Sequence, residues 1–192
     1  FWHSDLSYKE LPSLGSMLHA QELPSEGGDT LFADMHKAWD QLPAHLRAAV
    51  EGRSAAHSYT ARYSETKFEG NWRPTLTAEQ LAQLEEVIHP VVRTHPENGR
   101  KALFVNSGFT SLIPQLSRSE SQALLDLLFD QVAREPILSC RVRWTPNSLV
   151  FWDNRCTQHH AIWDYFPYSR YGERVTILGE RPLAANPELR LG

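Results

Sequence analysis

The last third of the chain is composed almost entirely of strand-forming stretches: ILSCRVRW (137–144), SLVFWDN (148–154), HHAIWDY (159–165) and ERVTILGE (173–180). Each is rich in β-branched and aromatic residues, which favour the pleated backbone. Several short strands with few helices are typical of an antiparallel barrel or a double-sheet jelly roll. The sequence therefore predicts a mainly β fold, a jelly roll with helical insertions, whose mouth can hold a small molecule.

Upstream of these stretches the sequence predicts two more strands, 16–23 and 30–34, separated by turn-forming residues. Asp34 can cap a helix over 35–42, and Pro43 suits the first turn of a second helix over 44–50. Further elements are expected downstream: a long loop over 59–75, helices opened by capping boxes at Thr77 and Ser117, and a hairpin turned by Asn98-Gly99.

The chain has 192 residues, of which 41% are hydrophobic and 22% charged, so we expect one domain over 1–192. The net charge of −4 gives no reason to expect a nucleic-acid partner, and no apolar run approaches the roughly 20 residues that span a bilayer. Two cysteines without disulfide-like spacing favour a reducing cytoplasm. A start in mid-strand suggests an N-terminally truncated fragment. A homo-oligomer is possible.

His3-Ser4-Asp5 is the first candidate for chemistry, because residues two apart on a strand share a face where an imidazole and a carboxylate can bind one metal. With nine histidines this spacing is common by chance. His95-Pro96-Glu97 repeats it, but a solvated hairpin turn explains that pair. His159 offers a third ligand, and two imidazoles with one carboxylate are typical of non-haem Fe(II) oxygenases.

Arg170 follows His159 by eleven residues, beyond a turn that contains Pro167, and is expected on the next strand. Its guanidinium can grip a carboxylate with two hydrogen bonds. The alternative is a surface arginine paired with Glu173 or Asp164. Core packing is expected of three tryptophans on the predicted strands: Trp144, Trp152 and Trp163.

The motifs WHSD (2–5), EGGDT (26–30), HPVVRTHPENGRKALFVN (89–106), FT (109–110), WDNRCTQHHA (152–161) and DY…R…RVTILGERP (164–182) together resemble the taurine dioxygenase family. That family also includes dioxygenases acting on 2,4-dichlorophenoxyacetate and on alkyl sulfates. The resemblance covers Phe1 to about Pro182. It implies a double-stranded β-helix and hydroxylation of a small anionic organic substrate, with consumption of O₂ and 2-oxoglutarate and release of succinate and CO₂.

Residue by residue, the resemblance implies Fe(II) ligation by His3, Asp5 and His159. It implies that Thr30 and Arg170 hold the distal carboxylate of 2-oxoglutarate, and that Arg174 meets the anionic group of the substrate. Tyr59 and Phe109 would line the substrate pocket. At the position of Tyr59 the family resembled here has a phenylalanine. The N-terminal region of family members is expected to be missing from this sequence.

Other possibilities remain open. Two histidines and an acid could instead hold Zn²⁺ in a hydrolase, although Arg170 and Thr30 would then have no role. A non-catalytic jelly-roll module would not need three converging ligands. An iron halogenase needs a small residue in place of Asp5. Arg174 could also form an internal salt bridge, with Glu173 or another acid, instead of meeting a substrate.

Overall fold

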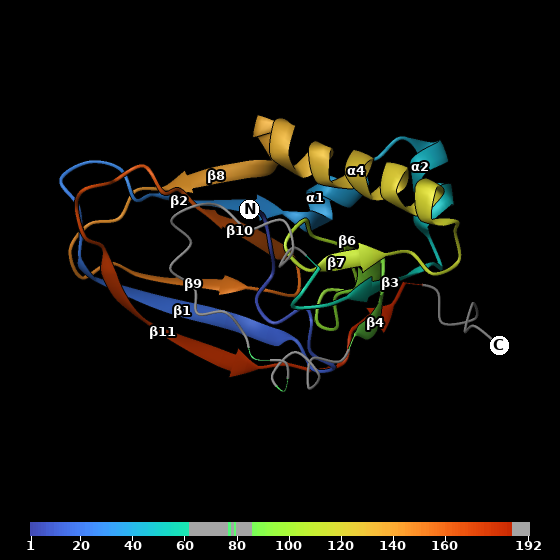
Figure 1. Cartoon of the computed structure of the whole chain (residues 1–192), viewed down its shortest axis with the longest axis horizontal. Coiled ribbons are helices and arrows are strands. Elements are labelled where there is room, and N and C mark those ends of the chain that lie inside the picture. Colours follow the sequence, from blue (N-terminus) through green and yellow to red (C-terminus); the bar gives the residue numbers. More distant parts are fainter. Residues whose placement is uncertain (62–76, 78, 80–85, 186–192) are drawn as a thin grey trace.

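The computed structural model describes residues 1–61, 77, 79 and 86–185, and Figure 1 gives their arrangement. Most of the loop predicted over 59–75, and most of the helix predicted from Thr77, lie outside the described residues.

Two antiparallel three-stranded sheets form the centre of the molecule. One has the order β11-β1-β9, with the bounds β1 (Ser13–Glu22), β9 (Leu149–Asp153) and β11 (Tyr171–Leu178). The other has the order β10-β2-β8, with the bounds β2 (Thr30–Asp34), β8 (Ser139–Val142) and β10 (Thr157–Ala161). The two sheets lie one above the other in Figure 1. The chain crosses from one sheet to the other between β1 and β2 and again at each step from β8 to β11, and the two sheets form the double-sheet jelly roll predicted from the sequence.

Two smaller sheets extend this centre. One is β12-β5-β6, from β12 (Leu183–Ala184), β5 (Val92–Thr94) and β6 (Lys101–Leu103). The other is β4-β3-β7, from β4 (Val87–Pro90), β3 (Ser54–His57) and β7 (Thr110–Leu112). The predicted hairpin is confirmed: β5 pairs antiparallel with β6, and Gly99 at the turn has φ +68°, which favours glycine.

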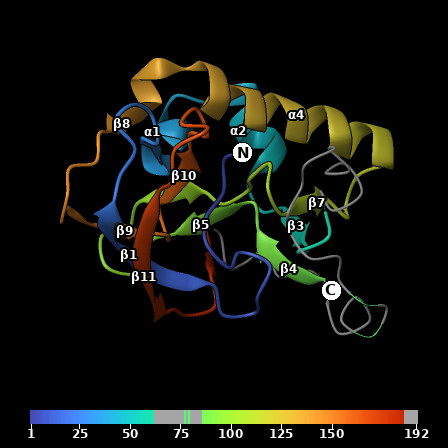
Figure 2. The same ribbon diagram turned by 60° about the vertical axis from the view of Figure 1, so that its left-hand side comes forward.

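The helices begin where the capping residues predicted. The Asp34 side chain accepts hydrogen bonds from two backbone N–H groups at the start of α1 (Met35–Asp40). Ser117 and Glu120 form a capping box at the start of α4 (Arg118–Arg134). Pro43 immediately precedes α2 (Ala44–Val50), and a 3₁₀ turn, η1 (Pro136–Leu138), follows α4. In Figures 1 and 2, α4 lies along one side of the molecule beside α1 and α2.

The apolar face of α4 packs into the core through Leu125, Leu128 and Val132. Full burial of each such side chain contributes about 1.5 to 3 kcal/mol to folding. Other large core side chains come from the helical insertion, from the sheets and from segments beside them, among them Trp2, Met35, Trp39, Val50, Leu103 and Ile113. No helix within the described ranges is sufficiently long and apolar to traverse a membrane.

The strand expected at the start of the chain, through His3-Ser4-Asp5, is not formed. Only His3 pairs there, as an isolated antiparallel bridge to His159, and a turn follows at once, with Leu6 at φ +57°. Because the chain turns directly after Asp5, no ladder can extend beyond one pair. Trp163 is also not a core residue, since 66% of it is exposed, whereas Trp144 and Trp152 are buried as expected.

Candidate active site

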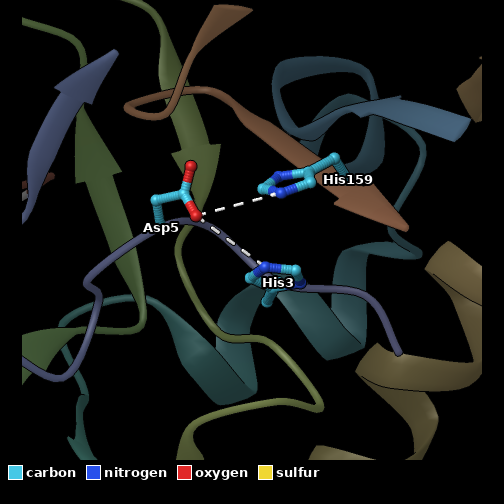
Figure 3. A group of neighbouring side chains, drawn as sticks. All are labelled: His3, Asp5 and His159. Atoms are coloured by element: carbon cyan, nitrogen blue, oxygen red, sulfur yellow. Dashed lines mark ion pairs between the residues drawn. The ribbon is translucent and has the colours of Figure 1, made fainter. Parts of the chain in front are cut away.

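Three side chains from two ends of the chain meet at one point: His3, Asp5 and His159 (Figure 3). The Nε2 atoms of His3 and His159 lie 3.8 Å and 3.9 Å from the same oxygen, Oδ1 of Asp5. Bridge pairing is the cause, because His3 and His159 exchange both backbone hydrogen bonds, at 3.1 Å and 2.9 Å. Residues directly opposite in an antiparallel pair place their side chains on the same face.

The protonation of this group suits metal binding. Burial lowers the pKa of His159 to about 3, with a further contribution from the neighbouring His3, whose own pKa burial also lowers. Burial alone would raise the pKa of Asp5, but His159, the Ser16 hydroxyl and the Arg174 guanidinium hold it below its usual value. Neutral imidazoles beside an ionised carboxylate are the forms that ligate metals.

The donor set fits a divalent ion. Ligand atoms bound at about 2.1 Å on one face of an octahedral ion are about 3 Å apart, so the observed separations need only small side-chain movements to close on it. Two imidazoles and a carboxylate on one side leave the other positions open, as in non-haem Fe(II) centres. The Nδ1 atom of His159 is buried and has no hydrogen-bond partner within the described residues, so the ring's orientation comes from packing against Phe32 and Trp152.

Arg174, on β11, does not pair with the adjacent Glu173. Its Nη1 atom donates to Oδ1 of Asp5 at 2.9 Å, while 48% of its side chain remains exposed. The sequence left two roles open for Arg174, a substrate contact and an internal salt bridge. The salt bridge is formed in this structure, with Asp5 and not with Glu173.

Thr30 and Arg170 also lie together. Arg170 directly precedes β11 instead of lying within a strand, and its Nη2 atom is 3.4 Å from Oγ1 of Thr30. Burial lowers the pKa of this guanidinium. Asp164, one of its alternative partners, is bound instead to the backbone N–H of Gly28 and lies 3.9 Å from Arg141.

Trp144 is the third member of the group formed by Thr30 and Arg170. The sequence indicated core packing for Trp144 but not this role. Its indole N–H donates to Oγ1 of Thr30 at 3.1 Å, and its ring lies under the Arg170 guanidinium at 5.3 Å. Gly28 has φ +73°, and a β-carbon there would lie 3.3 Å from the Arg170 side chain, so glycine allows the EGGDT turn to approach this closely.

Tyr59 and Phe109 lie in an aromatic cluster beside His3. Their rings stack at 6.4 Å, and Phe109 is 5.7 Å from the His3 ring. Two further members escaped the sequence analysis: Tyr8 lies 4.7 Å from Phe109, and Phe1 lies 5.1 Å from His3. The only signal for either was closeness in sequence to the His3-Ser4-Asp5 motif.

A second group of ligand-type atoms, from His95, Asp153 and Cys156, lies elsewhere in the fold. Here Arg155 already neutralises Asp153 with contacts of 2.7 Å and 2.9 Å, and His95 adds another at 3.1 Å. Burial raises the pKa of the Cys156 thiol to about 11. These features describe an internal ion-pair network and not an open metal site. The turn expected here is formed and Glu97 is exposed, but His95 is not solvated as expected, because its ring is buried and bonded to Asp153.

Curated relatives share this sequence over most of its length. An alpha-ketoglutarate-dependent sulfonate dioxygenase of Saccharomyces cerevisiae is 36% identical over 95% of the chain and 43% of its own length. An alkylsulfatase of Acinetobacter baylyi is 35% identical over 93% and 56%. An (S)-phenoxypropionate/alpha-ketoglutarate-dioxygenase of Sphingobium herbicidovorans is 37% identical over 85% and 57%. The chain spans about half the length of these relatives.

The fold has a close counterpart among solved structures. The crystal structure of AAD-2 in complex with Mn(II) and N-oxalylglycine matches with a TM-score of 0.85 at 31% identity, over 95% of this chain and 69% of that one. The model of the taurine catabolism dioxygenase TauD, TfdA family matches residues 1–176. This match takes in the three converging side chains as well as Thr30, Arg170 and Arg174, and the chain belongs to the TauD, TfdA family of taurine catabolism dioxygenases.

Proposed function

We propose that the protein is an Fe(II)- and 2-oxoglutarate-dependent dioxygenase that uses O₂ to hydroxylate a small anionic substrate and releases succinate and CO₂. His3, Asp5 and His159 would hold the iron. One observation carries the proposal: the ligand atoms of these three residues lie within 4.8 Å of one another, and one of the three, His159, pairs with Phe32 on the strand that also carries Thr30, the neighbour of Arg170.

The register of β2 and β10 supports that placement. Phe32 pairs with His159, and its ring stacks on the imidazole at 6.0 Å. Thr30 lies two residues before Phe32, so both side chains are on one face of β2, about 6 to 7 Å apart along the strand. A five-carbon diacid fits this span, with one carboxylate at Arg170 and Thr30 and the other end beside the ligand triad.

In this proposal the protein residues bind and orient the reactants. Arg170 grips the distal carboxylate, Thr30 gives it a further hydrogen bond, and Trp144 holds both residues in place. Iron with 2-oxoglutarate and O₂ supplies the oxidation of an unactivated C–H bond. The rings of Tyr59, Phe109 and Tyr8 provide an apolar wall that keeps water from the reacting carbon and fixes its position.

A sulfonate, an alkyl sulfate or an aryloxyacetate is the proposed substrate, with Arg174 as its charge partner. Each combines an anionic group, which suits a guanidinium, with an apolar part, which suits the aromatic cluster. Relatives named as a sulfonate dioxygenase, an alkylsulfatase and an (S)-phenoxypropionate dioxygenase support this choice of class.

The test is a substrate screen with the purified protein, Fe(II) and 2-oxoglutarate across these three classes of anion. Succinate should form only with O₂ and with an accepted substrate, and sulfite should appear with sulfonates. Zn²⁺-dependent turnover without 2-oxoglutarate would show a hydrolase instead. Binding of a metal without turnover of any substrate, with or without 2-oxoglutarate, would show a non-catalytic jelly-roll metal-binding module.

A further inference from the structure

A buried hydroxyl group donates a hydrogen bond to the Asp5 carboxylate. The Oγ–H group of Ser16, on β1, donates to Oδ2 of Asp5 at 2.6 Å, and Ser16 is completely buried. The short distance is characteristic of a hydroxyl bonded to an ionised carboxylate. Oδ2 of Asp5 is therefore occupied by a buried group of the protein.

Asn154 determines the direction of that hydroxyl. Its amide Nδ2 donates to Oγ of Ser16 at 3.0 Å and to Oγ of Ser13 at 3.2 Å. Its Oδ1 accepts from the indole N–H of Trp152 and from the backbone N–H of Asp5, each at 3.1 Å. These partners fix the amide's orientation, because the donor and acceptor ends cannot be exchanged. Since Ser16 accepts from Asn154, its single hydrogen is directed to Asp5.

The other oxygen, Oδ1, faces both imidazoles, at 3.8 Å from His3 and 3.9 Å from His159, and accepts a hydrogen bond from the half-exposed Arg174 side chain at 2.9 Å. We infer that Ser16, oriented by Asn154, is a positioning residue that selects Oδ1 of Asp5 as a single-oxygen metal ligand. This inference rests on the proposed function, because it requires the triad to bind a metal. Without the hydroxyl the carboxylate could rotate, and Oδ2 would be a buried acceptor without a partner.

Co(II) titration of the purified protein tests the inference, because the visible absorption of the bound ion reports its coordination. Ser16→Ala should weaken Co(II) binding about 10- to 100-fold, the usual effect of removing a partner of a metal ligand. It should also change the absorption spectrum. Ser16→Cys fills the same space with a much weaker donor and should show the same loss, which separates the hydrogen bond from the cavity.

Ser13→Ala is the matched control. Ser13 lies on the same strand and accepts from the same Asn154 amide, but it does not touch Asp5. Its removal should leave the Co(II) affinity and spectrum close to those of the parent, and thermal unfolding of each metal-free variant verifies that it is folded.

Parent-like binding and spectra in both Ser16 variants overturn the inference and leave the proposed function intact. Equal losses in Ser13→Ala and Ser16→Ala also overturn it, because the effect would then be structural. A parent protein that binds no Co(II) overturns the inference and the proposed metal site together.

Discussion

The Nη1 atom of Arg174 lies 2.9 Å from Oδ1 of Asp5, the same oxygen that faces the Nε2 atoms of His3 and His159. A buried carboxylate is costly without a compensating charge. Arg174 supplies that charge here, and a divalent ion bound by the triad would supply it instead. The guanidinium of Arg174, whose side chain is about half exposed, would then be available to an anion.

Replacing Arg174 by Ala should therefore destabilise the metal-free protein but not the metal-bound protein. Without metal, Asp5 loses its cationic partner in this variant, and the free energy of unfolding should fall by about 1 to 2 kcal/mol. The loss is limited because solvent screening weakens a pair that is partly exposed. Added Mn(II) should recover this loss, which urea unfolding with and without the ion will measure. Arg143→Ala, which removes an 87% exposed side chain, is the control.

The same variant tests the substrate role of Arg174. Arg174→Ala should weaken substrate-triggered O₂ consumption while leaving Fe(II) and 2-oxoglutarate binding nearly intact, because Arg170 and the triad are unchanged. O₂ electrode traces across sulfonates, sulfate esters and carboxylates will show the difference. If the variant turns over all three as the parent does, Arg174 is structural and the anionic-substrate proposal loses its main support.

Metal stoichiometry should distinguish the two ligand-type clusters. Asp5→Ala should abolish ordinary hydroxylation, even if some iron still loads through the two histidines. Cys156→Ser should leave one ion per chain, because Cys156 belongs to the cluster whose carboxylate Arg155 already neutralises. Equilibrium dialysis followed by elemental analysis measures the metal content of both variants, and formation of hydroxylated product measures the activity of Asp5→Ala. Loss of the ion in Cys156→Ser, with full retention in Asp5→Ala, would place the metal in the other cluster.

Arg170→Lys keeps the charge but removes the two-pronged geometry, so it should raise the KM for 2-oxoglutarate far more than that for substrate. Trp144→Phe is a milder version of the same test: the ring under Arg170 remains, but the hydrogen bond to Thr30 is lost. Its effect on the 2-oxoglutarate KM should be about 1 kcal/mol, or roughly fivefold. A larger effect on the substrate KM than on that of 2-oxoglutarate would reassign this group to the substrate.

Stability should fall in mild acid. His57 is fully buried, and burial lowers its pKa to about 3 from 6.5. Between these values the unfolded chain binds a proton that the folded chain does not, so the free energy of unfolding is greatest above pH 6.5 and declines as pH falls toward 3. The slope is up to about 1.4 kcal/mol per pH unit for each such histidine. His57→Leu should reduce the slope measured by urea unfolding, and an unchanged slope would contradict this prediction.

Local signals predicted much of this protein. Asp34 and Ser117 cap helices because a side-chain oxygen can bond only the nearest free N–H groups, and Asn98-Gly99 turns a hairpin because few residues adopt that backbone. The series of short strand-forming stretches in the last third of the chain predicted the jelly roll from the same kind of local signal. Each of these depends on neighbours within a few residues.

The motifs singled out His3, Asp5 and His159, but for a reason that the fold corrected: they meet through one bridge pair and a turn, not along a strand. Arg174 binds an acid that is 169 residues away in the sequence. The hydrogen bond from Ser16 to Asp5 forms only because β1 packs against the turn that begins at Asp5. Residue types and their spacing in sequence determined what chemistry this chain can carry. Tertiary structure alone decided which oxygen of Asp5 faces the two histidines, because that orientation depends on partners brought together only when the sheets close.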